Sequence, residues 1–371
     1  MSDSDTLLLN VPLDALHREL GGKMVPFAGY SMPVQYPAGV LTEHLHTRNA
    51  ASLFDVSHMG QVEITGADAV SWLETLVPGD IRGLGIGKTR YTVFTNAQGG
   101  ILDDLMVSKL GDNRLFLVIN AACKHADVAH MRAHLTGGVT LRPIEDRALV
   151  ALQGPKAAEA MVRLAPEAGA MTFMTISELS IAGIGCLATR SGYTGEDGWE
   201  ISVPTARAEE LVRALLAQPG VMPAGLGARD SLRLEAGLCL YGSDIDTTTT
   251  PVEANIAWIM NKRRRAEGGF PGAEVILGQL ATGAPRLRVG IQPVGRAPAR
   301  AHTEITDTAG NRLGEICSGG FGPSADRPVA MGYVPAAFAA IGTPLKLVVR
   351  GKALDAHVAA LPFVPHRYVK A

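Results

Sequence analysis

The sequence has little of what marks secreted, membrane-spanning or nucleic-acid-binding proteins. Only four of its 371 residues are cysteine, and their positions show no paired spacing typical of a zinc or redox site, so we expect reduced, buried and inert thiols. No apolar run approaches the length of a membrane span. The formal net charge is only −2 and the charges are dispersed, so neither nucleic acid nor a membrane is an expected partner. No constellation of side chains predicts a metal site.

The start of the chain also lacks the usual targeting features. Residues 1–5 are acidic and contain neither a basic region nor an Arg-rich amphipathic segment, and a Met stands first. These features predict a cytoplasmic protein. We expect a monomer by default.

The residues that are present predict a mixed fold of more than one domain. A chain of 371 residues exceeds what one hydrophobic core usually serves, so we expect two or three domains. Apolar spacing and capping residues predict helices over residues 40–51, 68–76 and 124–135. Strand-like apolar runs span residues 114–120 and 148–152. This mixture predicts an α+β fold.

The composition changes near residues 278–293, where a series of short strands with Gly, Pro and Asp turns begins. Residues 306–312 predict a hairpin tip, residues 329–334 a strand, and residues 345–349 and 354–360 a final hairpin. A compact β-barrel is the simplest closure of such strands.

The most informative segment, residues 99–107, places two adjacent carboxylates inside an apolar run that follows a turn. It predicts the returning strand of a hairpin whose first strand is residues 91–95. Because side chains alternate across a strand, Asp103 and Asp104 point to opposite faces. Two interpretations are open. The acids belong to a solvated strand end that protects a sheet edge, or one of them enters a pocket.

A loop rich in glycine, residues 191–200, joins two predicted strands and carries three acids. Its glycines would permit a ligand to approach the backbone closely. Glu200 lies off the apolar face of the following strand. It is either exposed to solvent or accepts two hydrogen bonds from a planar, amidine-like edge such as a pterin or guanine ring presents.

Residues 225–237 predict a loop that leads into a helix closed by Gly237. Arg229 and Arg233 are four residues apart and share one face of this helix. They are either a surface pair bridged to nearby acids of the same helix, or one guanidinium meets an anionic or carbonyl-bearing ligand.

Two further features have both a structural and a functional interpretation. The basic cluster Lys262–Arg265 predicts first a solvated loop, and second a surface for docking an acidic partner. His58 is a lone histidine, which we interpret as a structural residue rather than a catalyst.

Together these segments closely resemble the glycine cleavage T-proteins, a family of aminomethyltransferases. The resemblance spans almost the whole chain, and its motifs occur in the same order. The matching motifs are Lys23–Gly29, Phe54–Gly60, Gly99–Leu105, Gly192–Glu200, Gly225–Ala236, Ser318–Pro323 and Pro362–Pro365. Two departures occur: Ser108 is often tyrosine in relatives, and Gly319–Pro323 replaces the usual Gly-Thr-Phe-Ser-Pro.

The resemblance implies three domains around a central cavity that holds tetrahydrofolate. The implied domains are a discontinuous α+β folate-binding core over residues 1–60 and 145–280, an inserted α+β domain over residues 61–144 that carries the acidic hairpin, and a C-terminal β-barrel over residues 285–371. The lipoylated H-protein and the other glycine cleavage components are implied as partners. In this family the one-carbon unit of aminomethyl-lipoyl H-protein passes to tetrahydrofolate, which gives 5,10-methylenetetrahydrofolate, ammonia and dihydrolipoyl H-protein.

By the same resemblance, Asp104 is the catalytic residue, which orients folate near its 10-nitrogen and stabilises a cationic, iminium-like intermediate. Asp103 is then structural, and Glu200 corresponds to the acid that binds the pterin edge. The other implied folate-contacting residues are Tyr91, Tyr193, Arg229 and Tyr368, with Arg367 as an alternative to the last.

Two other functions are compatible with the same scaffold. One is a folate-dependent demethylase that acts on a small methylated substrate without a carrier protein. The other is a non-enzymatic folate-binding protein of the kind used in iron-sulfur cluster maintenance, but the sequence lacks the Lys-Gly-Cys segment of that group. The intact acidic hairpin and the 192–200 loop favour the aminomethyltransferase.

Overall fold

The computed structural model describes residues 8–370, which form two compact units, each described here by itself. Unit 1 comprises described residues 8–60, 144–230 and 367–370, and unit 2 comprises residues 61–143 and 231–366. None of the helices within residues 8–370 has the length and apolarity to cross a lipid bilayer. The acidic start of the chain, on which the expectation of a cytoplasmic protein rests, lies outside these residues.

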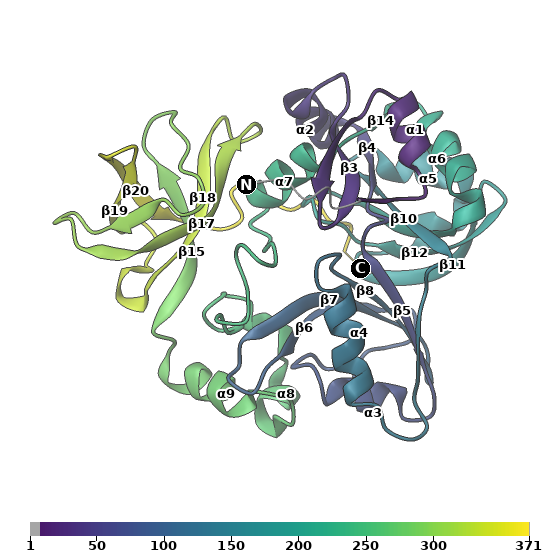
Figure 1. The fold of residues 1–371 in the computed structure, drawn as a ribbon, viewed down its shortest axis with the longest axis horizontal. Coiled ribbons are helices and arrows are strands. Elements are labelled where there is room, and N and C mark those ends of the chain that lie inside the picture. Colours follow the sequence, from purple (N-terminus) through teal and green to yellow (C-terminus); the bar gives the residue numbers. More distant parts are fainter. Residues whose placement is uncertain (1–7, 371) are drawn as a thin grey trace. The chain divides into compact units, whose positions relative to one another are not determined.

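Unit 1 is built on a six-stranded sheet with a smaller three-stranded sheet beside it in the same unit (Figure 1). The large sheet has the order β11-β12-β13-β10-β4-β14 and the small one the order β1-β3-β2. The strands are β1 (Leu9–Asn10), β2 (Lys23–Phe27), β3 (Tyr30–Gln35), β4 (Ala51–Asp55), β10 (Arg147–Gln153), β11 (Thr175–Ile181), β12 (Ile184–Arg190), β13 (Gly198–Pro204) and β14 (Val221–Pro223). The helices are α1 (Asp14–Glu19), α2 (Val40–Asn49), α5 (Ala157–Leu164) and α6 (Ala208–Leu216), with 3-10 turns η1 (Pro166–Ala170) and η2 (Thr205–Arg207).

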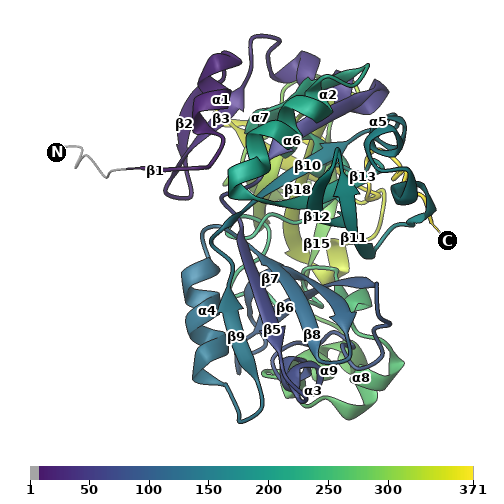
Figure 2. The same ribbon diagram turned by 90° about the vertical axis from the view of Figure 1, so that its right-hand side faces the viewer.

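The core of unit 1 lies between the large sheet and helices α5 and α6, which pack on its strands (Figure 2). Strand β10 has a strand neighbour on each side, β4 and β13, and residues 148–153 are all buried. Full burial explains why its sequence is a continuous apolar run rather than an alternating one.

Unit 2 combines a five-stranded sheet, order β6-β7-β8-β5-β9, with a closed six-stranded barrel, order β15-β18-β17-β16-β19-β20. The sheet strands are β5 (Gly60–Thr65), β6 (Thr89–Thr95), β7 (Ile101–Gly111), β8 (Arg114–Ile119) and β9 (Thr140–Pro143). The barrel strands are β15 (Arg286–Pro293), β16 (Glu304–Thr306), β17 (Arg312–Gly322), β18 (Arg327–Pro335), β19 (Pro344–Val349) and β20 (Lys352–Ala359). The helical elements are α3 (Ala69–Glu74), α4 (Lys124–Ala133), η3 (Ala257–Ile259), α8 (Lys262–Glu267), α9 (Ala273–Thr282) and η4 (Ala336–Phe338), and α7 (Leu226–Glu235) spans the division between the units.

The predicted α+β fold with a C-terminal β-barrel is confirmed. The three helices expected near residues 40, 68 and 124 are α2, α3 and α4, each within two residues of its predicted end. The helix expected after residue 225 is α7, and Gly237 ends it with φ +68°, a conformation that glycine adopts without strain. All four cysteines are free thiols, but only Cys186 and Cys239 are buried as expected.

The acidic hairpin does not lie at a sheet edge. Strand β7, which carries both acids, is paired with β6 on one side and with β8 on the other. Asp103 is completely buried, whereas Asp104 is half-buried on the opposite face. The interpretation of these acids as a solvated edge is therefore wrong, because neither side of β7 is open for another strand.

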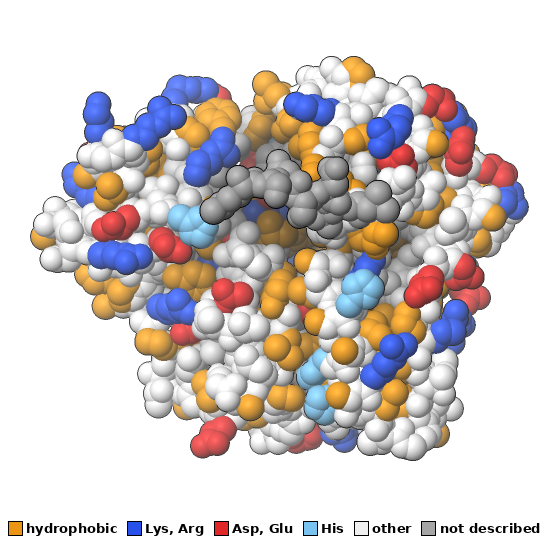
Figure 3. All heavy atoms as spheres, viewed as in Figure 1, with side chains coloured by type: hydrophobic (Ala, Val, Ile, Leu, Met, Phe, Trp, Pro, Cys, Tyr) orange, Lys and Arg blue, Asp and Glu red, His pale blue; other side chains and the backbone are white. Residues whose placement is uncertain are grey.

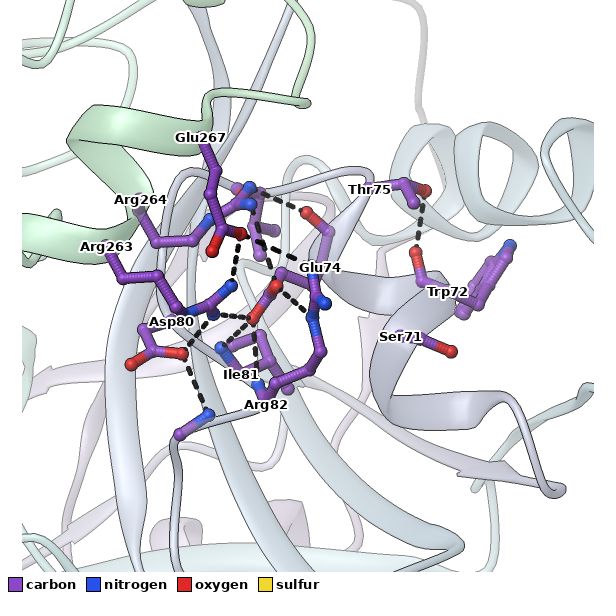
Figure 4. A network of polar contacts seen from close by, with 12 residues as sticks. Ser71, Trp72, Glu74, Thr75, Asp80, Ile81, Arg82, Arg263, Arg264 and Glu267 are labelled. Atoms are coloured by element: carbon purple, nitrogen blue, oxygen red, sulfur yellow. Dashed lines mark hydrogen bonds and ion pairs between the residues drawn. The ribbon is translucent and has the colours of Figure 1, made fainter.

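The prediction of a solvated loop over Lys262–Arg265 is also wrong. These residues form most of α8, whose first turn is capped by the Asn261 side chain. The Arg264 guanidinium is buried and donates to the carbonyls of Glu74 and Val77, both at 2.9 Å. The Arg263 guanidinium binds the carboxylates of Glu74 and Asp80 (Figure 4). Arg265 also donates within unit 2, to the carbonyls of Met260 and Ala257, so three of the four cations are used there rather than left for a partner. Basic and acidic side chains are interspersed over the face drawn in Figure 3.

We expect Glu74→Gln to destabilise the protein by about 3–5 kcal/mol, the usual cost of leaving buried charges without their partner. The Glu74 carboxylate accepts from Arg263 at 2.6 Å and from the Arg82 side chain at 2.5 Å, and it is almost completely buried. Urea unfolding at neutral pH measures the loss. Glu267→Gln is the matched control, because this acid binds the same Arg263 but is half-exposed, and it should cost less than about 1 kcal/mol.

The effect of Glu74→Gln should depend on pH. Burial alone would raise the pKa of Glu74, but the hydrogen bonds from Arg263 and Arg82 outweigh burial and lower it. Since the folded-state pKa is the lower one, this stabilisation is present above the unfolded value of about 4.3 and is lost as the pH falls through the folded value. The stability difference between the two proteins should therefore shrink below about pH 4. A difference that stays constant into acid would show that charge is not the cause.

Candidate functional site

The predicted catalytic acid is held by side chains from the two strands next to it. The Tyr91 hydroxyl donates to Asp104 Oδ2 at 3.0 Å, and Asn120 Nδ2 donates to Asp104 Oδ1 at 2.7 Å. The strand register explains both contacts. Val93 lies opposite Asp104, so Tyr91 is its diagonal neighbour on the same face, and Asn120 directly follows the last residue of β8. The carboxyl group is thus fixed in one orientation by two donors.

Asp104 is also electrostatically unusual. Burial and, second to it, the nearby charge of Asp103 raise the pKa of its carboxyl group to about 7, against the hydrogen bonds from Tyr91 and Asn120, which lower it. A carboxyl group with such a pKa changes its charge near neutral pH. It can therefore stabilise a positive charge or accept a proton under the conditions in which enzymes work.

Asp103 serves the opposite face of the same strand. Its two carboxylate oxygens accept from the backbone N–H and the side-chain amide of Asn120, at 3.0 and 2.9 Å. It also forms side-chain hydrogen bonds with Asp127 of α4 and with Cys123. Two carboxyl groups can bond to one another only through a shared proton, and burial together with the charge of Asp103 raises the pKa of Asp127. Asp127 therefore carries the proton, and these contacts tie β7 to α4 and to the end of β8.

In unit 1 the structure brings together Tyr193, Glu200 and Arg229. The Arg229 guanidinium lies over the Tyr193 ring, 4.8 Å from its centroid. Burial lowers the pKa of Arg229, while the nearby charge of Glu200 acts in the opposite direction. Glu200 is half-buried and accepts from the Ser191 hydroxyl at 3.2 Å through Oε2. A carboxylate, a guanidinium and an aromatic ring thus form one group.

This group has unused hydrogen-bonding capacity. Arg229 Nη1 is buried and has no hydrogen-bond partner within the described residues. A buried donor without a partner is costly, and a ligand that supplies an acceptor removes the cost. A pterin ring offers an amidine-like edge that donates to a carboxylate, a carbonyl that accepts from a guanidinium and a flat face for an aromatic ring. The residues therefore fit the heterocycle that the sequence motifs imply.

The interpretation of Arg229 and Arg233 as a surface pair is wrong. Arg233 is buried in unit 2, where its guanidinium donates to Asp244 at 2.5 Å and to the Ser318 hydroxyl at 2.9 Å. Asp244 and Ser318 both lie outside α7. Arg233 instead links the end of α7 to barrel strand β17.

The glycines of the 191–200 loop serve the protein's own packing. A Cβ on Gly192 would lie 1.9 Å from the Gln153 side chain, and one on Gly198 would lie 2.2 Å from the Leu152 carbonyl. Gln153 in turn accepts from the Thr194 hydroxyl at 2.7 Å. At Gly192 and Gly198 the lack of a side chain thus permits close contact with β10, rather than the approach of a ligand that the sequence predicts.

Arg367 and Tyr368, near the C-terminus, contact a second group of residues in unit 1. Arg367 donates through Nη2 to the Arg48 carbonyl and to Glu196 Oε1, both at 2.6 Å. Arg48 also donates to Glu196 Oε1, at 2.7 Å. The Tyr368 ring stacks on Phe173 with centroids 3.9 Å apart, and burial raises its pKa to about 12. Arg367 and Tyr368 thus contact Arg48, Glu196 and Phe173 in unit 1.

His58 is buried, and its ring meets the edge of Phe27 with centroids 5.4 Å apart. This environment is typical of a packed structural histidine.

Asn120 is a site residue that sequence reasoning misses, because its position predicts only the end of a strand. A polar residue at the end of an otherwise apolar run, next to the acidic strand in the sheet, is the signal that could have found it.

Comparison with known proteins decides the family. Residues 13–264 match the family model described as the GCVT N-terminal domain, and residues 286–365 match the glycine cleavage T-protein C-terminal barrel domain. The chain belongs to the glycine cleavage T-protein family. Together the two matches include all of the barrel strands and all of the predicted site residues except Arg367 and Tyr368.

Full-length relatives agree with this family. The chain is 46% identical over 385 residues to the mitochondrial aminomethyltransferase of Dictyostelium discoideum, which covers 99% of this chain and 95% of that protein. It is 47% identical over 378 residues to the mitochondrial aminomethyltransferase of Gallus gallus, which covers 100% and 96%. The crystal structure of glycine cleavage system aminomethyltransferase T from Bartonella henselae superposes with a TM-score of 0.92 at 45% identity, over 98% of this chain and 100% of that one.

As a member of this family, the chain is an aminomethyltransferase of the glycine cleavage system, and tetrahydrofolate is its co-substrate. This confirms the activity that the sequence motifs imply. The demethylase and the non-enzymatic folate-binding protein are correspondingly disfavoured.

Proposed function

We propose that the aminomethyl donor is the lipoylated H-protein and that Asp104 assists the transfer of its one-carbon unit to tetrahydrofolate. The carbon–sulfur and carbon–nitrogen bonds of the aminomethyl thioether break, and bonds from this carbon to folate nitrogens 5 and 10 form. The two protons released by these nitrogens go to the thiolate and to ammonia, so the products are 5,10-methylenetetrahydrofolate, ammonium and dihydrolipoyl H-protein. No oxidant or reductant is needed.

The observation that carries this proposal is the fixed, half-buried carboxyl group of Asp104. Loss of ammonia or of the thiolate leaves positive charge on the one-carbon unit, and a carboxylate held in place stabilises that charge without reorganising. Tyr91 and Asn120 hold the carboxyl group in position. Ring closure at nitrogen 10 then releases a proton, which a carboxyl group with a pKa of about 7 can accept.

We further propose that Glu200, Arg229 and Tyr193 bind the pterin ring. Their support is the buried, unpartnered Arg229 Nη1 beside a half-buried carboxylate and an aromatic face. Folate contact by Tyr368 or Arg367 stays a prediction; in unit 1 Tyr368 stacks on Phe173 and Arg367 donates to Glu196.

The pH dependence of the reaction should report on Asp104. If its carboxylate is the active form, kcat/KM for the donor rises with pH and reaches half its maximum near pH 7, because the pKa of the free enzyme is raised to about 7. A bound cation favours the carboxylate, so the corresponding rise of kcat with pH should occur at lower pH. Rates measured between about pH 5.5 and 8.5 test this. If kcat/KM does not change with pH, or if its rise near pH 7 persists in Asp104→Asn, the rise does not report on Asp104.

The proposed reaction is tested by supplying aminomethyl-lipoyl H-protein and tetrahydrofolate and following ammonia and 5,10-methylenetetrahydrofolate together. We expect both products to appear in equal amounts and only when both substrates are present. A small methylated amine or sulfonium compound replaces the H-protein in a parallel reaction. Turnover of the small compound, with none of the H-protein, would favour a demethylase instead.

The division into three domains, the monomeric state and the cytoplasmic location stay predictions. The two compact units do not themselves separate residues 61–144 from residues 285–366, because both ranges fall almost entirely in unit 2. The eukaryotic relatives are named as mitochondrial proteins.

A further inference from the structure

Trp258 is exposed beside the predicted catalytic acid. Its side chain is 65% exposed, whereas the other two tryptophans, Trp72 and Trp199, are at most 4% exposed. The indole stacks on the Tyr91 ring, with centroids 5.7 Å apart and 25° between the planes. Tyr91 in turn donates its hydroxyl proton to Asp104. Tyr91 therefore connects the exposed indole of Trp258 to the Asp104 carboxyl group, which we propose as catalytic.

The exposure of this indole is not a consequence of a loose loop. Trp258 stands in the 3-10 turn η3, and its neighbours Ile256, Ile259 and Met260 are buried in one apolar cluster with Val93 of β6. Arg265 of α8 donates to the carbonyls of Ala257 and Met260, both at 3.0 Å, which fixes the turn from its other side. The turn buries its apolar neighbours and presents only the indole. The indole face is thus held open on the surface, where a ligand can contact it.

The charges around the ring pair indicate what kind of group binds. Asp103 and Asp104 lie on adjacent positions of β7, and the negative charge of Asp103 acts on the Asp104 carboxyl group. A positively charged group from a ligand is the complement of such a site. Indole and phenol faces attract cations, and indole does so most strongly. The site therefore suits a small ammonium group on an apolar stem.

We propose that Trp258 and Tyr91 form an aromatic surface that receives the aminomethyl ammonium group of the donor arm next to Asp104. This inference rests on the proposed function, in which a lipoylated H-protein delivers that group as a thioether. The indole face would contact both the ammonium and the apolar arm, while Asp104 faces the charge. Trp258 is then a donor-binding residue, and Glu200 with Arg229 serves the other substrate.

Steady-state kinetics of Trp258→Ala and Trp258→Phe test this assignment. We expect Trp258→Ala to raise KM for aminomethyl-lipoyl H-protein roughly tenfold or more, the size of a lost cation–π contact, and to leave KM for tetrahydrofolate unchanged. Trp258→Phe keeps a weaker aromatic face and should recover part of the loss. Ile341→Ala is the matched control, because Ile341 is 74% exposed in unit 2 and lies on the barrel side of the chain, before β19.

A binding measurement separates donor recognition from turnover. Because Trp258 is the exposed tryptophan, acrylamide quenching of the wild-type fluorescence reports mainly on it, and the difference from Trp258→Phe isolates its signal. Aminomethyl-loaded H-protein should protect this signal more strongly than dihydrolipoyl H-protein, which lacks the ammonium group. Fluorescence lifetimes avoid the absorption of folate in the parallel experiment with tetrahydrofolate.

The outcomes are distinct. A raised KM for tetrahydrofolate alone, or protection of Trp258 by tetrahydrofolate and not by the H-protein, overturns the proposal and makes the indole a folate contact. Equal protection by loaded and unloaded H-protein overturns recognition of the ammonium. Protection that grows with enzyme concentration alone would assign the ring to contact between copies of this chain. Failure of the proposed function itself is recognised separately, because the wild-type protein would then release no ammonia from the donor.

Discussion

Asp104→Asn is expected to lower kcat roughly 10²–10³-fold while the dissociation constant of tetrahydrofolate changes little. Asparagine keeps the size of the side chain and can still exchange hydrogen bonds with Tyr91 and Asn120, so the local structure should persist. What it removes is the negative charge that would face the cationic one-carbon unit. Removal of a fixed charge from a half-buried site affects the transition state more than the ground state.

Single-turnover rates of methylenetetrahydrofolate formation, with folate binding measured in parallel, check this result. Asp112→Asn is the control, because Asp112 follows the same strand but its side chain is 82% exposed. The control should be as active as the wild type. Full activity of Asp104→Asn with normal folate affinity would show that its charge is not used.

Glu200→Ala should have the opposite signature and weaken tetrahydrofolate binding first. Removal of a desolvated charge that pairs with a ligand costs roughly 2–5 kcal/mol, which corresponds to an affinity loss of about 30-fold or more. The variant also leaves the buried guanidinium of Arg229 without the nearby negative charge. At saturating tetrahydrofolate, kcat should stay within about tenfold of the wild type, because Asp104 is intact.

Isothermal calorimetry with tetrahydrofolate measures this loss. Glu200→Gln keeps one acceptor oxygen and should fall between the wild type and the alanine variant. Glu178→Ala serves as the control, since Glu178 is an exposed acid on β11 of the same sheet. If Glu200→Ala binds tetrahydrofolate as tightly as the control does, Glu200 is not a pterin ligand.

Local structure could be predicted well where one chain segment contains its own signal. The hairpin around the acids, helices α2, α3 and α4 and the strands of the barrel follow from apolar spacing, caps and turn residues close together in sequence. The alternation of Asp103 and Asp104 across β7 is likewise a local property, since successive side chains of a strand point to opposite faces. Motif order then indicated the family without any structure.

The errors share one physical cause, which is that partners distant in sequence decided the outcome. Within the basic cluster Lys262–Arg265, Arg264 is buried and Arg263 is half-buried, because the carboxylates of Glu74 and Asp80, more than 180 residues earlier, neutralise them. Arg233 is buried because Asp244 and Ser318 receive its guanidinium. Charge burial depends on such partners, and no local pattern states where they are.

The sequence by itself thus determined the fold class, the family and the identity of the candidate catalytic acid, because these depend on short motifs and local periodicity. Only the tertiary structure decided which groups hold that acid and what surrounds it. Sheet pairing brings Asn120 and Tyr91 to Asp104, and packing of η3 brings Trp258 to Tyr91 from more than 160 residues away. The pKa of Asp104 likewise follows from burial and from Asp103 in the folded chain. Proximity of this kind is a product of packing, and a linear pattern does not contain it.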